Sequence, residues 1–155
     1  MLQPGDIAPA FSLFDTDKKK INLGDYKGKN LLILFFPLAF TRVCTTELCT
    51  VRDNLSQYQQ LQTEVVGISV DSLYTLKKFK EEQLLNFPLL SDFNKTVSIA
   101  YDSMYETFSY EMKGVSKRSA FIVDKNGYVR YAEVLDNASE IPDFKTIQNS
   151  LLTLV

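Results

Sequence analysis

The sequence predicts an α/β fold in which a central mixed β-sheet is flanked by helices. Three observations support this class. Patterns typical of buried strands alternate with helical patterns over the N-terminal part of the chain, an antiparallel hairpin pattern follows, and a helical pattern comes last. Strands that alternate with helices and are followed by an antiparallel pair produce a sheet of mixed direction with helices on both faces.

The first expected elements are a hairpin and a buried strand. Residues 11–22, FSLFDTDKKKIN, alternate imperfectly around a polar centre, which predicts a short hairpin with its three lysines in a solvated turn. Residues 30–36, NLLILFF, are a continuous apolar run, which is typical of a central strand buried on both faces.

The middle of the chain predicts a helix, a strand and a second helix. Apolar residues recur three or four positions apart over residues 45–61, as in an amphipathic helix. Residues 64–70, EVVGISV, predict another buried strand. A helical period then runs to residue 85, after Asp71 and Ser72, whose side chains can cap a helix.

The last elements are a third strand, a short helix, a hairpin and a final helix. Residues 87–92, FPLLSD, predict a strand at an edge of the sheet, because Pro88 has no N–H group to donate. Residues 119–135 predict a hairpin around Asn126-Gly127, a pair that favours positive φ. The final helix is expected to begin near Pro142.

Size and composition indicate a single domain, residues 1–155, with a substantial core. A net charge of −2 gives no sign of a protein that binds nucleic acid or a membrane surface. The N-terminus lacks the pattern of a signal peptide, and the longest apolar run is too short to span a bilayer. We therefore expect a cytoplasmic protein without nucleic-acid or membrane partners, whose thiols are kept reduced.

Cys44 follows a buried strand, at the kind of strand end where function gathers in α/β sheets. If a helix begins near Thr45, Cys44 lies in its first turn or at its cap, where N–H groups and the helix dipole favour a thiolate. Such positions bring a thiol pKa from about 8.5 to between about 3.5 and 7.5. The chain has no histidine, so this thiol would be activated by the dipole, a hydroxyl and an arginine.

Two residues before Cys44 suit such a site. Thr41 can hydrogen-bond both the sulfur and a bound oxygen, and Pro37 would form one wall of a shielded pocket. The alternative is that Cys44 is a small core residue. The polar residues Thr41, Arg42, Thr45, Thr46 and Glu47 around it disfavour that interpretation.

Pro37, Thr41 and Cys44 match the Pro-x-x-x-Thr/Ser-x-x-Cys signature, and the chain thereby resembles the peroxiredoxins, which are thiol peroxidases. The resemblance extends over nearly the whole chain, through GDIAPAFSL, VVGISVDS and GVSKRSAFIVDKNGYVRYAE in the expected order. It implies a thioredoxin-like three-layer fold. It also implies that no metal or organic cofactor is required.

The resemblance further implies a role for each site residue. Cys44 would be the peroxidatic cysteine, which attacks the O–O bond of hydrogen peroxide or an alkyl hydroperoxide and becomes a sulfenic acid. Thr41 would align peroxide and thiolate, Pro37 would exclude water, and Arg118 would stabilise the developing charge. From spacing alone Arg118 could instead be a surface charge. Glu47 could orient the arginine or lie on the helix surface.

Cys49 is expected to resolve the sulfenic acid of Cys44. Helical residues five apart are separated by about 140° around the helix axis, and their Cα atoms lie about 8.6 Å apart. That distance exceeds the limit of about 7 Å for a disulfide. The helix must therefore unwind. The bacterioferritin-comigratory or Q type of the family has this Cys-x₄-Cys spacing and uses local unfolding. FFPLAFT, residues 35–41, is more similar to the one-cysteine alkyl-hydroperoxide-reductase-E group, in which an external thiol would resolve Cys44.

The family implies thioredoxin or a similar small dithiol as reductant. The oligomeric state is open between a monomer and a homodimer in which Phe40, Tyr105 and Phe108 could pack at the active-site edge. The same residues bear on other functions. A thiol–disulfide oxidoreductase usually needs Cys-x-x-Cys, and zinc needs more soft ligands than two cysteines provide. A non-enzymatic redox sensor or holdase remains an alternative, distinguished by oxidation without turnover.

Overall fold

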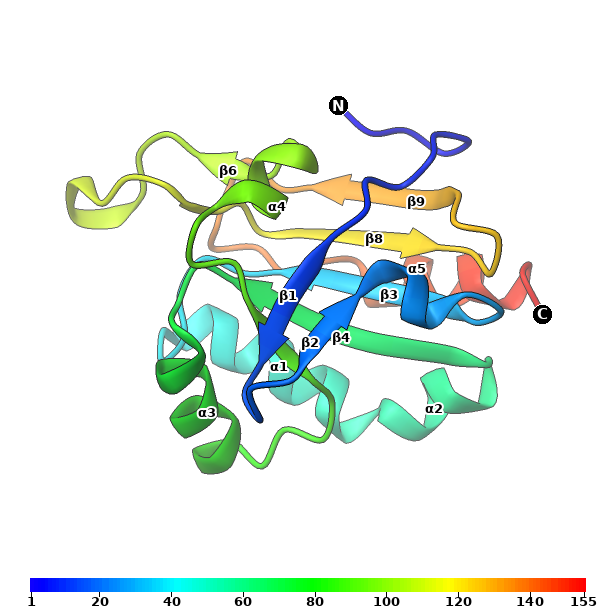
Figure 1. Ribbon diagram of the computed structural model, residues 1–155, viewed down its shortest axis with the longest axis horizontal. Helices are drawn as coiled ribbons and strands as arrows, with labels where there is room; N and C mark the ends of the chain where they lie inside the picture. Colours follow the sequence, from blue (N-terminus) through cyan, green and yellow to red (C-terminus); the bar gives the residue numbers. More distant parts are fainter.

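A mixed sheet of seven strands forms the centre of the computed structural model, which describes residues 1–155, and its strand order is β2-β1-β5-β4-β3-β8-β9 (Figure 1). The strands are β1 (Ser12–Asp15), β2 (Lys20–Asn22), β3 (Asn30–Phe35), β4 (Thr63–Ser69), β5 (Leu89–Ser91), β6 (Met104–Tyr105), β7 (Val115–Ser116), β8 (Ser119–Val123) and β9 (Val129–Val134). The helices are α1 (Arg42–Asp53), α2 (Leu55–Gln60), α3 (Leu73–Glu82), α4 (Thr96–Ala100) and α5 (Phe144–Leu152), with short 3₁₀ turns η1 (Leu23–Tyr26) and η2 (Ser109–Glu111). The predicted α/β class is confirmed.

Strand β3 lies in the middle of the sheet, parallel to β4 and antiparallel to β8, and all of its residues are buried. Its alternate side chains enter two separate cores. Leu32 and Leu34 pack in a core that includes residues of α1, α2, α3 and α5. Leu31 and Ile33 pack in a second core that includes α4. Helices thus cover both faces, which explains why the strand is apolar throughout.

The predicted helix over residues 45–61 is two helices. Helix α1 begins at Arg42, and Asn54 separates it from α2 with non-helical φ and ψ of −114° and 14°. The Asn54 side chain donates to the Thr50 carbonyl at 2.8 Å, so it bonds the end of α1. Asparagine competes well for backbone partners in this way, and the apolar periodicity continues across the break because both helices cover the same core.

The prediction that Pro88 marks an edge strand is wrong. Strand β5 lies inside the sheet, parallel to β4 and antiparallel to β1. Pro88 precedes the strand and contributes only its carbonyl, which accepts from the Gly67 N–H at 3.0 Å. The missing N–H group is therefore never needed.

Strands β6 and β7 were not predicted, because each has only two residues and no measurable alternation. They form a hairpin that projects from the body at the left of Figure 1. Tyr105 and Val115 of this hairpin pack with Val70, the residue that follows β4. None of the helices is long and apolar enough to cross a bilayer.

Candidate active site

The loop between β3 and α1 carries Pro37 and Thr41, and it is fixed by the neighbouring strand β4. Pro37 is buried, and Thr41 is the N-cap residue of α1. The Ala39 N–H donates to Asp71 Oδ2 at 2.8 Å, and the Ser69 hydroxyl donates to the same oxygen at 2.7 Å. Asp71 therefore anchors the loop. The cap of α3 is Ser72, which accepts from the Thr75 N–H.

Cys44 is the third residue of α1, so it lies in the first helical turn as predicted. It is 0% exposed. Both terminal nitrogens of Arg118 donate to its sulfur, Nη1 at 3.4 Å and Nη2 at 3.3 Å. The register of the sheet explains why Arg118 reaches Cys44. Phe35 pairs with Ser119, so the carboxyl end of β3 lies beside the start of β8.

Arg118 is held by two further partners. Its Nε donates to the Ala138 carbonyl at 3.0 Å, and Nη1 donates to Glu47 Oε1 at 2.8 Å. Both Arg118 and Glu47 are buried, so neither is the surface residue that spacing alone allowed. Glu47 Oε2 has no hydrogen-bond partner. The carbonyl of Ala138 had no signal in the sequence, because any residue could supply it.

Burial raises the pKa of the Cys44 thiol, while Arg118, the Thr41 hydroxyl and the Leu38 backbone lower it and Glu47 raises it again. The net direction is upward, contrary to the lowered pKa expected from the helix N-terminus. The physical reason is desolvation, which disfavours an anionic sulfur that has no contact with water. The sequence could not reveal how deeply this residue is covered.

Glu47 shares the single positive charge of Arg118 with Cys44. Burial raises the pKa of Glu47 to about 7 despite the neighbouring guanidinium. Burial lowers the pKa of Arg118, but Cys44 and Glu47 together raise it, so the guanidinium stays charged. One buried cation can compensate one buried anion, so the thiolate is favoured when Glu47 carries a proton.

The Thr41 hydroxyl donates to the Leu38 carbonyl at 2.7 Å, which fixes its position in the turn before α1. The same turn contains Phe40, which has a φ of 68° and is 48% exposed. Its ring packs against Phe79 at 5.2 Å between centroids. Thr41 thus lies between Phe40, whose ring is held by aromatic packing, and the first turn of α1, which contains Cys44.

The other two aromatic residues expected at an interface are engaged within the chain. Tyr105 is buried, its hydroxyl donates to the Leu135 carbonyl at 2.8 Å, and its ring stacks on that of Phe108 at 5.9 Å. Only Phe40 presents much of its ring to solvent.

Cys49 also lies on α1, but the structure does not bring it to Cys44. Both thiols are free and the helix between them is intact. Cys49 is half-buried, and its thiol donates to Gln83 Oε1 at 3.6 Å. Nothing in the sequence indicated Gln83, which follows α3 and lies 34 residues from Cys49.

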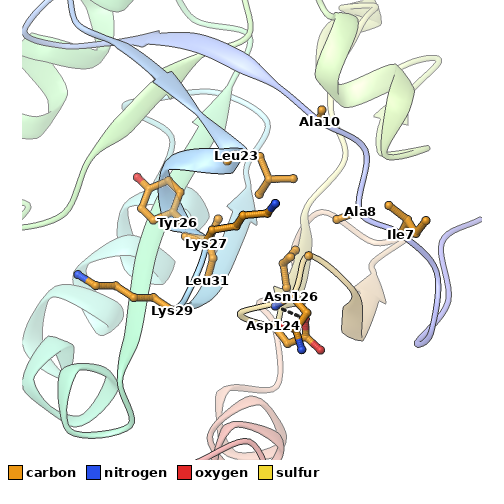
Figure 2. Close-up of a pocket in the computed structure, with 13 residues that line it drawn as sticks. Ile7, Ala8, Ala10, Leu23, Tyr26, Lys27, Lys29, Leu31, Asp124 and Asn126 are labelled. Carbon is orange, nitrogen blue, oxygen red and sulfur yellow. Dashed lines mark hydrogen bonds between the residues drawn. The ribbon is translucent and has the colours of Figure 1, made fainter.

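A cavity of about 250 Å³ lies away from both cysteines, between the N-terminal arm, η1 and the β8–β9 turn (Figure 2). Its apolar wall includes Ala8, Leu23 and Leu31, and Lys27 lies at its rim. Leu31 is near the start of β3, whereas Cys44 follows the end of that strand. No group of three or more cysteine or acidic side chains is arranged to hold a metal ion.

Comparisons with known proteins show the family and the fold of this chain. Residues 4–132 match the model of the AhpC/TSA family. Peroxiredoxin Bcp of Escherichia coli K12 is 38% identical over 146 residues, which cover 94% of this chain and 88% of that protein. The crystal structure of a PrxQ mutant of Xylella fastidiosa has a TM-score of 0.87 at 25% identity, covering 99% of this chain and 97% of that one. Peroxidoxin BcpB of Mycobacterium tuberculosis has a TM-score of 0.88 at 24% identity, with coverage of 100% and 99%, and supports the fold.

Proposed function

Because this chain belongs to the AhpC/TSA family and is a peroxiredoxin, a thiol-dependent peroxidase, we propose that Cys44 is its peroxidatic residue. The family implies a hydroperoxide as substrate and a thiol as reductant. One observation carries the assignment to Cys44: a guanidinium 74 residues away in the sequence directs two N–H groups at its sulfur. Cys49 has no such partner.

In the first step the Cys44 thiolate attacks one oxygen of the hydroperoxide. An S–O bond forms, the O–O bond breaks, and the leaving oxygen takes a proton and departs as water or an alcohol. Arg118 is placed to stabilise the thiolate and then the charge that moves onto the oxygens. The protonated form of Glu47 leaves the charge of Arg118 free for this task.

Thr41 and Pro37 would shape the pocket around the sulfur. The Thr41 hydroxyl would hold the hydroperoxide in line with the thiolate, and Pro37 would keep water from the sulfenic acid. Cys44 is fully covered in the resting structure, so the residues that cover it would have to move to admit the peroxide.

In the second step Cys49 would resolve the sulfenic acid. Its sulfur would attack that of Cys44, an S–S bond would form, and the hydroxyl oxygen would leave as water. Both cysteines lie in the intact helix α1, so at least its first turns would unwind. Thioredoxin or a similar dithiol would then reduce the disulfide. The enzyme would act in the cytoplasm as one domain, residues 1–155, in a monomer or a homodimer in which Phe40 contributes to the contact.

Mass analysis after one equivalent of hydrogen peroxide tests both steps. The native chain should lose two hydrogens, the Cys49→Ser variant should gain one oxygen, and the Cys44→Ser variant should not change. If Cys49→Ser gives the same product as the native chain, Cys49 is not the resolving residue and an external thiol takes that role.

Turnover with a thioredoxin system separates the peroxidase from a redox sensor. Continuous peroxide consumption that Cys44→Ser abolishes supports the assignment. Oxidation that stops after one equivalent in the presence of reductant would instead support a sensor. Turnover that persists in Cys44→Ser would contradict the choice of Cys44.

A further inference from the structure

The part of α1 that carries Cys49 is attached to the end of α3. The Cys49 thiol donates to Gln83 Oε1 at 3.6 Å. Arg52 Nη1 donates to the Gln83 carbonyl at 2.6 Å, and the Asn86 side chain donates to the Arg52 carbonyl at 3.2 Å. Gln83 is the C-cap residue of α3, so Arg52 satisfies a carbonyl at a helix end that has no partner within the helix.

The contact between Cys49 and Gln83 is incompatible with a disulfide between Cys49 and Cys44. The two cysteines differ by about 140° around the helix axis, and their sulfurs bind different partners, Arg118 for Cys44 and Gln83 for Cys49. Cys49 must therefore leave the Gln83 amide before it can reach Cys44. That hydrogen bond is part of the barrier to resolution.

The helix beyond Cys49 is firmly packed. Val51 is completely buried in the core that α1 shares with α3. Arg52 is bonded through both its side chain and its carbonyl. Unwinding beyond Cys49 would expose Val51 and break both bonds of Arg52. The change that brings the thiols together is therefore expected to stop at Cys49, and within it Leu48 would lose its burial.

We propose that Gln83, held in place by Arg52, is a positioning residue that retains Cys49 in the helix and thereby sets the rate of resolution. The inference rests on the proposed resolving role of Cys49. Release from Gln83 lets the Cys49 sulfur attack Cys44, with formation of the S–S bond, cleavage of the S–O bond and loss of water. While Cys49 is retained, the sulfenic acid is open to a second peroxide, which would oxidise it to the sulfinic acid. Gln83 thus also determines sensitivity to over-oxidation.

The test follows Cys44 oxidation and disulfide formation separately, by rapid mixing with hydrogen peroxide, acid quenching and mass analysis. Gln83→Met removes the acceptor at nearly constant size, and Gln83→Glu keeps an acceptor oxygen. Gln57→Met, an exposed residue of α2, is the matched control. Cys44 oxidation should keep its native rate in all of these variants. Disulfide formation should be about twofold faster in Gln83→Met, the equivalent of one weak hydrogen bond from a thiol donor. Gln83→Glu should be no faster than the native chain, and Gln57→Met should match it.

Arg52→Met should accelerate disulfide formation in the same direction, because Gln83 loses the donor that fixes its backbone. The double variant Gln83→Met/Arg52→Met should be no faster than the faster single variant, as expected for residues that act on one contact. Sulfinic acid formed in excess peroxide should decrease in Gln83→Met.

The outcomes distinguish this inference from the proposed function. Absence of a disulfide in the native chain would overturn the resolving role of Cys49 and this inference with it. A native disulfide that forms at the same rate, or more slowly, in Gln83→Met would overturn the role of Gln83 alone. Equal acceleration in Gln83→Met and Gln83→Glu would reduce Gln83 to a general structural residue and would also overturn it.

Discussion

Arg118 and Glu47 form an ion pair at 2.8 Å, and their side chains are only 2% and 0% exposed. The same guanidinium nitrogen also donates to the Cys44 sulfur. Thiol and carboxyl therefore compete for one buried positive charge. This competition links the protonation of Glu47 to the reactivity of Cys44, and it makes Glu47 part of the site although it is not part of the Pro-Thr-Cys signature.

Replacement of Glu47 by glutamine should shift the titration of Cys44 to lower pH. Glu47 raises the pKa of the Cys44 thiol, and glutamine cannot ionise, so the charge of Arg118 would favour the thiolate alone. The measurement is the rate of alkylation of Cys44 by iodoacetamide as a function of pH, in a Cys49→Ser background. An unchanged or higher midpoint would contradict the competition between the two acids.

The stability of the native chain should fall relative to Glu47→Gln as the pH rises from about 4.5 to about 7. The pKa of Glu47 is raised from its ordinary 4.5 to about 7 by burial, so the folded state binds more protons than the unfolded state over this interval. Stability conferred by the protonated carboxyl is then lost as the pH rises through the folded-state value. Urea unfolding of both proteins at several pH values, on Cys44→Ser chains that remove the thiol titration, measures the difference. Parallel curves would contradict it.

Replacement of Arg118 by methionine should reduce kcat/KM for hydrogen peroxide by about 100-fold or more, the loss typical of a missing donor to developing charge. Lysine at this position should recover little, because one ammonium cannot reproduce the contacts with Cys44, Glu47 and Ala138. Peroxide competition kinetics provide the measurement.

Arg118→Met should also cost about 1–3 kcal/mol of stability near neutral pH, because burial keeps Glu47 protonated once the guanidinium is gone and its carboxyl loses a hydrogen-bond partner. Addition of Glu47→Gln should change that stability little, because the protonated carboxyl is already neutral, and it should not restore activity. Full activity in a folded Arg118→Met protein would be incompatible with the proposed role.

Replacement of Thr41 by valine should slow peroxide reduction by about 100-fold, whereas serine, which keeps the hydroxyl, should stay close to the native rate. The Thr41 hydroxyl lowers the pKa of Cys44, so the valine variant should also alkylate less readily at neutral pH. No hydrogen bond from a helical N–H reaches the Thr41 side chain, so the stability loss should be limited to the bond with Leu38, about 1 kcal/mol. Equal rates for valine and serine would show that the hydroxyl has no catalytic role.

Replacement of Gly67 by alanine should destabilise the chain by about 1–3 kcal/mol through overpacking. A Cβ atom there would lie 2.8 Å from Leu89 Cδ2 and 3.3 Å from Phe36 Cε1. Gly24→Ala is the control, because nothing lies within 4 Å of its Cβ position. Denaturant unfolding compares the free energies of unfolding of the two variants. Equal stability would mean that the residues around Gly67 shift enough to accommodate the added methyl group.

Much of the fold could be predicted because burial leaves a periodic trace in the sequence. The continuous apolar run of β3 follows from cores on both of its faces, and the hairpin of β8 and β9 follows from its turn residues. The break at Asn54 was missed because the apolar period continues across it. The inner position of β5 was not predicted, because the sequence of a strand does not indicate which other strands pair with it.

By itself, the sequence determined the class of fold, the strand end that carries the chemistry, and the place of Cys44 in a first helical turn, because these depend on neighbours along the chain. Only the tertiary structure decided that Arg118 reaches the sulfur, that Glu47 is buried against it, that Asp71 anchors the loop and that Gln83 retains Cys49. Each of those contacts joins residues more than 30 positions apart. Sheet register and helix packing decide which distant residues come into contact. They also determine how deeply Cys44 is buried, and this desolvation raises the pKa of its thiol.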